Sequence, residues 1–132
     1  MKKMIIVTAV IAIIIFVGAY MLLGNRIKGS YNNGEANFEY GHIMKKTSLT
    51  PEDINHINII FSNKKLYVDH PSCSFSPNIS IIMDDTELFC FAQDGCPIVY
   101  YANRNRYFQL SREENSQLHS ILKKYGFIFP CV

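Results

Sequence analysis

The hydrophobic pattern divides this chain into one long apolar run and a second part in which short apolar stretches alternate with polar ones. The run covers residues 4–23 and contains no charged residue, while Lys2 and Lys3 precede it and Arg26 and Lys28 follow it. A helix rises about 1.5 Å per residue, so this run spans roughly 30 Å, the thickness of a bilayer's hydrocarbon core. We therefore predict a transmembrane helix over residues 4–23, preceded by a short cytoplasmic basic end over residues 1–3.

The same run could also serve as a cleavable signal peptide, with cleavage near Ala19 after the small residues Gly18 and Ala19. The apolar region of a signal peptide is typically about 7–15 residues long. Here the run is longer, and residues 21–23 continue it past the candidate cleavage site. A retained signal anchor is therefore the favoured interpretation, and a secreted or periplasmic product is the alternative.

The next stretch, residues 24–47, shows no sustained hydrophobic period. It is rich in glycine and asparagine, a composition typical of linkers, and Phe38 and Tyr40 are the aromatic residues in it that could pack on a domain. We predict a flexible tether over residues 24–47 and a folded domain over residues 48–132.

The first half of the predicted domain mixes a helix start with strand-like segments. The sequence Thr-Pro-Glu-Asp at residues 50–53 is a helix N-terminus signature, with a capping threonine and proline at the first helical position. The β-branched run at 57–61 predicts a strand that ends this helix early, with residues 66–68 as its hairpin partner. For residues 77–85 the pattern fits a helix and a strand equally, so both remain open.

The second half gives a clearer pattern. Residues 88–91 and 98–101 are strand-like and are separated by the turn dipeptide Asp94-Gly95, and residues 107–110 follow as a third strand. Ser111 and Glu114 fit a capping box, and apolar residues at helical spacing follow it. The fold class predicted is α+β: a single N-terminal transmembrane helix, then a small antiparallel sheet with a C-terminal helix packed on it.

The cysteines suggest the compartment of this domain. There are four of them, all after the apolar run: Cys73, Cys90, Cys96 and Cys131. An even number in a small domain is typical of compartments in which disulfides persist. We therefore expect a disulfide-linked domain on the extracytoplasmic side of a single-pass inner or plasma membrane. Sequence alone leaves three pairings open; the spacing favours Cys90 with Cys96 and Cys73 with Cys131.

The charge balance of the domain excludes one class of partner. Four of the thirteen basic residues flank the apolar run, and the remaining nine face eleven acidic residues. A slightly acidic domain lacks the basic surface that nucleic-acid binding requires. The lipid bilayer, through residues 4–23, and another envelope or secreted protein are the partners that we expect.

The sequence offers little catalytic chemistry. Its four histidines show no metal-ligand spacing, and phosphate-binding or nucleophile motifs are absent from the sequence. We therefore predict no enzyme, cofactor or metal site. The alternative hypothesis is a small envelope enzyme that uses Asp69, His70 and His119.

The remaining function class is a binding module of the accessory or immunity type, held at the membrane. Aromatic residues and arginine concentrate at binding hot spots. One hairpin is rich in both, so it is the predicted binding patch: Tyr100, Tyr101, Arg104, Arg106, Tyr107 and Phe108.

Overall fold

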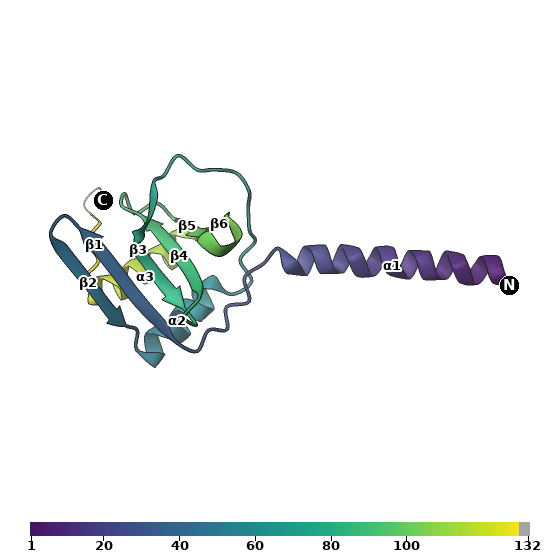
Figure 1. Cartoon of the computed structure of the whole chain (residues 1–132), viewed down its shortest axis with the longest axis horizontal. Coiled ribbons are helices and arrows are strands. Elements are labelled where there is room, and N and C mark those ends of the chain that lie inside the picture. Colours follow the sequence, from purple (N-terminus) through teal and green to yellow (C-terminus); the bar gives the residue numbers. More distant parts are fainter. Residues whose placement is uncertain (130–132) are drawn as a thin grey trace.

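The computed structural model describes residues 1–129 and begins with a single long helix, α1 (Lys2–Gly24), that extends away from the rest of the molecule (Figure 1). None of its residues is buried. The helix is long and apolar enough to cross a membrane, and its place near the N-terminus also suits a signal sequence.

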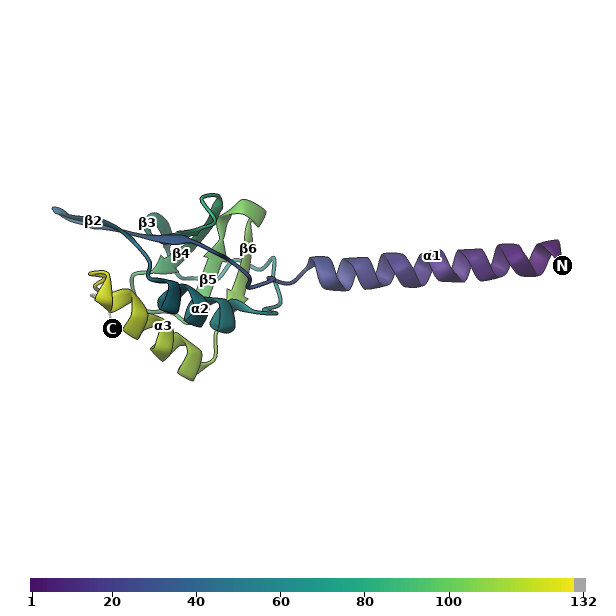
Figure 2. The ribbon, with the colours of Figure 1, turned by 90° about the horizontal axis from the view of Figure 1, so that it is seen from below.

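The domain that follows is an antiparallel sheet with two helices on one face (Figure 2). The strands are β1 (Gly34–Tyr40), β2 (Ile43–Ser48), β3 (Phe75–Met83), β4 (Glu87–Ala92), β5 (Ile98–Tyr101) and β6 (Arg106–Gln109), in the spatial order β2-β1-β3-β4-β5-β6. Helix α2 (Pro51–Phe61) lies between β2 and β3 in the chain, a short 3₁₀ turn η1 (Ala102–Arg104) joins β5 to β6, and α3 (Arg112–Lys124) follows β6. The predicted α+β class is confirmed.

The hydrophobic core lies between the sheet and the two helices. Because successive side chains of a strand point to opposite faces, every second residue of the central strands faces the helices. The largest fully buried side chains include Phe38 of β1, Phe89 of β4, Phe108 of β6 and Phe61 of α2. Phe61 contacts both Phe89 and Phe108, with ring centroids 5.0 Å apart in each pair.

The predicted strand at 57–61 is wrong, because α2 continues through Phe61. Ile57, Ile60 and Phe61 recur at the three- and four-residue spacing of one helix face and are all buried. Burial of this face outweighs the strand preference of β-branched residues. Residues 66–68 are not its hairpin partner either, since Tyr67 instead forms an isolated bridge with Tyr107 of β6.

The predicted tether over residues 24–47 is wrong for its larger part. Residues 34–40 and 43–47 belong to β1 and β2, which form a hairpin in register. Ala36 and Phe38 are buried, whereas the alternate residues Glu35 and Asn37 are only partly buried and face the other side, which is the two-residue period of a strand. Gly41 has φ +60° at the first position of the two-residue turn, a conformation that glycine adopts without strain.

The second half of the domain agrees with its predicted elements. Residues 75–83 form strand β3, which settles the ambiguity at 77–85 up to Met83, and β4, β5 and β6 follow in hairpin order. At α3, the Ser111 side chain accepts from the backbone N–H of Glu114 and the Glu114 carboxylate accepts from that of Ser111, so the capping box is confirmed. Phe127 and Phe129 are buried beyond the helix.

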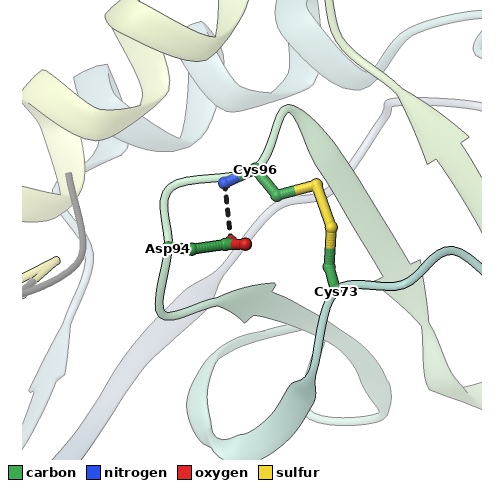
Figure 3. A group of neighbouring side chains, drawn as sticks. All are labelled: Cys73, Asp94 and Cys96. Atoms are coloured by element: carbon green, nitrogen blue, oxygen red, sulfur yellow. Dashed lines mark hydrogen bonds between the residues drawn. A yellow bond between two sulfur atoms is a disulfide. The ribbon is translucent and has the colours of Figure 1, made fainter.

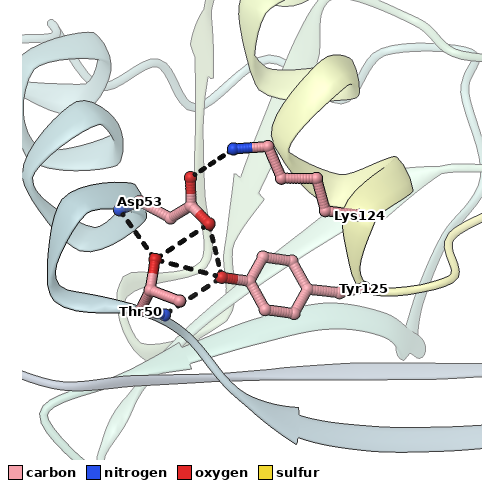
Figure 4. A network of polar contacts seen from close by, with 4 residues as sticks. All are labelled: Thr50, Asp53, Lys124 and Tyr125. Carbon is pink, nitrogen blue, oxygen red and sulfur yellow. Dashed lines mark hydrogen bonds and ion pairs between the residues drawn. The ribbon is translucent and has the colours of Figure 1, made fainter.

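A polar network joins the start of α2 to the end of α3 (Figure 4). The Asp53 carboxylate is only 3% exposed and accepts hydrogen bonds from Lys124 at 2.9 Å, from Tyr125 at 2.5 Å and from Thr50 at 3.0 Å. Burial alone would raise the pKa of Asp53, but the hydrogen bonds from Tyr125, Lys124 and Thr50 outweigh it and lower that pKa. The donors of Thr50, Lys124 and Tyr125 and the carboxylate of Asp53 satisfy one another within this network, so it stabilises the packing of α2 on α3.

The disulfide links Cys73 to Cys96 (Figure 3), so the predicted pairings Cys90–Cys96 and Cys73–Cys131 are wrong. The bond ties the loop before β3 to the loop between β4 and β5, two segments that the sequence separates by 23 positions. Cys90 is buried and is bonded to no cysteine among residues 1–129, and Cys131 lies outside the described residues. Pairing depends on which loops the sheet brings together, which sequence spacing does not reveal.

Candidate functional site

The six residues of the predicted binding patch do not form one surface. Tyr101 and Phe108 point to the helix side of the sheet and belong to the core, with 7% and 1% exposure. Tyr100 and Tyr107 are paired across β5 and β6 and point to the opposite face. Arg104 lies in the turn between these strands, over the ring of Tyr101. The patch prediction treated neighbours in sequence as neighbours on a surface, whereas strand alternation separates them.

Tyr100 and Tyr107 are part of an aromatic group on the sheet face opposite the helices. Their ring centroids lie 4.9 Å apart, and Phe75 packs against both rings. The ring nitrogen Nδ1 of His70 lies 2.9 Å from the Tyr107 hydroxyl oxygen, within hydrogen-bonding distance. This group, together with the Cys73–Cys96 disulfide, holds the loop before β3 against the sheet.

The three residues of the enzyme hypothesis do not converge. Asp69 and His70 line one shallow hollow of about 220 Å³ beside Tyr107. His119 belongs to α3, on the opposite side of the sheet, where its ring stacks on Phe129 at a centroid distance of 4.2 Å. Burial, with a smaller contribution from Lys123, lowers the pKa of His119. The sheet therefore separates His119 from the other two, and Cys73 is bonded to Cys96 rather than available as a nucleophile beside His70.

Side chains of the types that bind metal ions also lie close together at the disulfide. Sulfur atoms of Cys73 and Cys96 and a carboxylate oxygen of Asp94 lie within 4.8 Å of one another. The sulfurs are bonded to each other, and the Asp94 carboxylate accepts the backbone N–H of Cys96 at 3.1 Å (Figure 3). A metal would need thiolates, so this arrangement functions as a cross-link.

The β1–β2 hairpin presents a surface of a different kind. The backbone N–H of Leu49 donates to the carbonyl of Gly34 at 2.8 Å, just beyond the first registered pair of the hairpin. Hydrogen-bonded and non-hydrogen-bonded pairs alternate along antiparallel strands, so residues 43, 45 and 47 exchange main-chain hydrogen bonds with β1. The N–H and C=O groups of Met44, Lys46 and Ser48 consequently point away from β1.

These outward groups make β2 the open edge of the sheet. All six residues of β2 are exposed, and no strand among residues 1–129 pairs with its outer side. At the other edge, Tyr67 exchanges two main-chain hydrogen bonds with Tyr107 of β6, at 2.7 and 2.9 Å, and covers part of that strand. The two edges therefore differ: within residues 1–129, β2 offers a continuous row of main-chain groups and β6 does not.

The hairpin tip is apolar as well as exposed. Tyr40 and Ile43 flank the turn and Met44 follows, and Met44 is 72% exposed. The tip is the part of the sheet farthest from α1 (Figures 1 and 2). The sequence signal for this site was present in the alternation of residues 35–40 and in the single glycine of the turn, but the surrounding Gly and Asn residues were interpreted as a linker.

No family model matches this chain, and neither the curated proteins nor the solved structures searched include a match to it. The chain is therefore characterised by its own architecture: an apolar N-terminal helix and a disulfide-linked α+β domain in which the open edge formed by β2 lies at the far end from that helix.

Proposed function

We propose that this protein is a non-catalytic binding module, anchored in the membrane by α1, with its domain on the extracytoplasmic side. The proposed docking element is the outer edge of β2, which receives an extended segment of another envelope or secreted protein as an additional strand. In this mode, main-chain hydrogen bonds supply affinity and alternate side chains supply specificity.

The observation that carries the proposal is the open edge itself. Natural proteins ordinarily shorten, cover or bulge their edge strands, or place charged side chains, especially lysine, on them, because an open edge is a template for pairing with another chain. Lys45 and Lys46 are a protection of this last kind and restrict β2 to partners that tolerate a positive charge. Here the strand is six residues long, in unbroken register with β1, and ends in an apolar tip. The opposite edge of the same sheet is partly covered by Tyr67. An edge left open at the membrane-distal end supports docking by strand addition.

The charges of β2 favour an acidic partner over a second copy of the chain. In the two registers nearest the strand centre, an antiparallel pairing of β2 with itself would place Lys45 opposite Lys45 of the other copy, or Lys46 opposite Lys46. Like charges directly opposite each other destabilise a strand pair. Lys45 and Lys46 point to opposite faces of the hairpin. Lys46 is paired with Glu35 of β1 at 3.2 Å, whereas Lys45 forms no ion pair among residues 1–129 and can meet an acidic residue of an incoming strand.

The extracytoplasmic location is supported by the disulfide. Cys73 and Cys96 come from different loops and are bonded to each other, and such bonds persist in oxidising compartments and are rare in the cytosol. The length of α1 supports its retention as the anchor.

The experiment tests the edge through its main-chain groups. A photo-crosslinking amino acid at Thr47 is placed in otherwise native full-length protein, in a Met44→Pro variant and in a Met44→Thr variant, all expressed in the source cell. Proline removes the outward N–H at position 44 while leaving the bonds between β2 and β1, whereas threonine removes the same apolar side chain and keeps the N–H. Circular dichroism of the purified variants establishes that the fold is retained.

We expect a defined protein adduct in the native and Met44→Thr backgrounds and a yield at least about fivefold lower in Met44→Pro, the effect of losing one hydrogen bond of roughly 1 kcal/mol. Equal adduct yields in the proline and threonine variants would exclude strand addition at this edge. Strand addition would also be excluded if a crosslinker at Ile59, an exposed residue of α2, gave an adduct and the crosslinker at Thr47 gave none.

A further inference from the structure

The junction between α1 and the domain is fixed by hydrogen bonds. The backbone N–H of Ile27 donates to the carbonyl of Lys64 at 3.0 Å, and the N–H of Leu66 donates to the carbonyl of Asn25 at 2.9 Å. The Asn25 side chain adds a bond to the carbonyl of Leu66 at 3.1 Å. Ile27 itself is buried in the core. The domain therefore begins within three residues of the end of α1. The end of the domain that contains Lys64 and Leu66 is the one next to α1.

A cavity of about 360 Å³ lies at this end, and we call it the junction pocket. Its charged lining consists of three basic residues, Arg26, Lys28 and Arg104, and two carboxylates, Asp84 and Glu87. Its volume falls within the range of small-molecule sites, about 300–1,000 Å³.

The carboxylates of the junction pocket are already occupied by neutral donors. Asp84 accepts the backbone N–H groups of Asn32 and Asn33 at 2.8 and 3.1 Å. Glu87 accepts the hydroxyl of Tyr101. Neither carboxylate has a cationic nitrogen within 4.0 Å, since the three ion pairs found in residues 1–129 lie elsewhere.

The cations are consequently left without an anionic partner. Within the described chain, Arg26, Lys28 and Arg104 line one pocket and none forms a salt bridge. Arg26 uses one nitrogen, Nη1, on the carbonyl of Asn63 at 2.9 Å, and Arg104 uses its Nη1 on the carbonyl of Gly24 at 2.7 Å. A guanidinium has five N–H donors, so both arginines keep donors for a further acceptor.

Arg104 is also held in place. Its guanidinium lies over the ring of Tyr101, with 5.8 Å between the guanidinium carbon and the ring centroid. The hydrogen bond to Gly24 fixes its other side. A positioned planar fork of this kind suits the oxygens of a phosphate group, which it can bind with two parallel hydrogen bonds.

Tyr31 adds a neutral donor to the same lining. Burial, assisted by the negative charges of Glu87 and Asp84 and opposed by Arg104, raises the pKa of Tyr31 to about 12. Its hydroxyl therefore keeps its proton under physiological conditions.

We propose that the junction pocket binds a phosphate ester, and that its source is the headgroup of an anionic phospholipid. The location favours this source, because Gly24 is the last residue of α1 and Arg104 is bonded to it. With α1 in the bilayer, the pocket lies at the level of the headgroups, where its basic side chains can reach the phosphate of a lipid. This inference rests on the retention of α1 as an anchor, which is part of the proposed function.

The test uses the full chain in phosphatidylcholine nanodiscs that contain a small amount of spin-labelled phosphatidylglycerol. Electron paramagnetic resonance gives the fraction of labelled lipid whose motion the protein restricts. Arg104→Lys keeps the charge and removes the planar fork. Arg106→Gln removes one positive charge two residues away, at the start of β6, from a residue that does not line the junction pocket. A second arm measures saturable binding of glycerol phosphate to the same samples.

We expect a preference for phosphatidylglycerol over phosphatidylcholine that falls at least about fivefold in Arg104→Lys and less in Arg106→Gln. Saturable, Arg104-dependent binding of glycerol phosphate without lipid preference would support the phosphate site and assign it to a soluble ester. The inference would be overturned if Arg104→Lys kept the lipid preference of the native protein, or if the native protein showed neither a preference for phosphatidylglycerol nor saturable binding of glycerol phosphate. Met44→Pro leaves the lipid preference unchanged, because position 44 lies at the other end of the sheet. The intact mass of the protein shows whether α1 has been lost. Failure of the lipid proposal is therefore distinguishable from failure of the docking proposal.

Discussion

Arg104 donates a hydrogen bond of 2.7 Å to the carbonyl of Gly24, a residue 80 positions earlier in the chain. The turn between β5 and β6 therefore contacts the last residue of α1. Together with the main-chain bonds of Asn25 and Ile27, this contact orients the domain on the helix, so that the β1–β2 hairpin extends to the other end (Figure 2). A domain oriented in this way presents its open edge away from the membrane that we propose for α1.

The Cys73–Cys96 disulfide is predicted to stabilise the folded domain. The double variant Cys73→Ser/Cys96→Ser removes a cross-link across 23 positions, for which the chain-entropy model gives about 3 kcal/mol. We expect urea unfolding of the full chain in detergent, followed by near-ultraviolet circular dichroism of its tyrosines, to show a loss of about this size. Cys90→Ser is the control, since Cys90 takes no part in the disulfide and its substitution leaves the cross-link in place. Equal stability of native protein before and after reduction would contradict the assignment.

Asp53→Asn tests the network between α2 and α3. Asparagine keeps the shape and removes the charge that Lys124 and Tyr125 bind, so we expect a loss of about 2 kcal/mol at pH 7. The pKa of Asp53 is lowered in the folded state. Its contribution is therefore complete above the ordinary carboxyl pKa of about 4 and is lost as the pH falls through the lower folded value.

The measurement for Asp53 is a series of urea unfolding curves from pH 7 to pH 3. The stability difference between the native protein and Asp53→Asn shrinks towards the acid end. Glu52→Gln is the matched control, since this neighbouring carboxyl is exposed. A difference that is independent of pH would show that the charge of Asp53 has no role.

The capping box of α3 predicts a smaller and local effect. Ser111→Ala removes the acceptor for the backbone N–H of Glu114, and N-cap substitutions of this kind cost about 1 kcal/mol. Hydrogen exchange at residues 113–115 reports the fraying directly. Ser116→Ala, within the helix, replaces serine by a better helix former and serves as the control. Comparable exchange in the two variants would refute the role assigned to Ser111.

Cys90 is predicted to be chemically inert in the folded protein. It points to the sheet face opposite the helices and is 2% exposed, and burial raises its pKa to about 11. Thiolate is the reactive form, so alkylation at pH 8 should be at least about a hundredfold slower in native protein than in urea. A Cys131→Ser background restricts the measurement to one thiol. Rapid alkylation of the folded protein would place Cys90 at the surface.

Much of the domain was predictable where the local pattern and the final environment agree. The capping box at Ser111, the turn at Asp94-Gly95 and the strands that flank it depend on short-range signals, and the structure retains each of them. Residues 57–61 show the limit of such signals. Their β-branched composition favours a strand, whereas their spacing suits one buried helix face, and the packing of Phe61 against Phe89 and Phe108 decides between them.

The candidate sites were less predictable because they depend on contacts between distant segments. The residues 100–108 suggested one patch, but the alternation of a strand sends Tyr100 and Tyr101 to opposite faces. The pairing of Cys73 with Cys96 follows from the positions of two loops. The junction pocket joins Arg26 to Arg104, and its lining comes from three separate parts of the chain.

The most direct test of the whole account is mass spectrometry of the full-length protein extracted from carbonate-washed membranes of the source cell. We expect a product that retains residues 1–23 and that yields, without reduction, a cross-linked peptide pair containing Cys73 and Cys96. A product in the cytosolic fraction with both thiols reduced, or one that begins after Ala19, would contradict the anchored extracytoplasmic module.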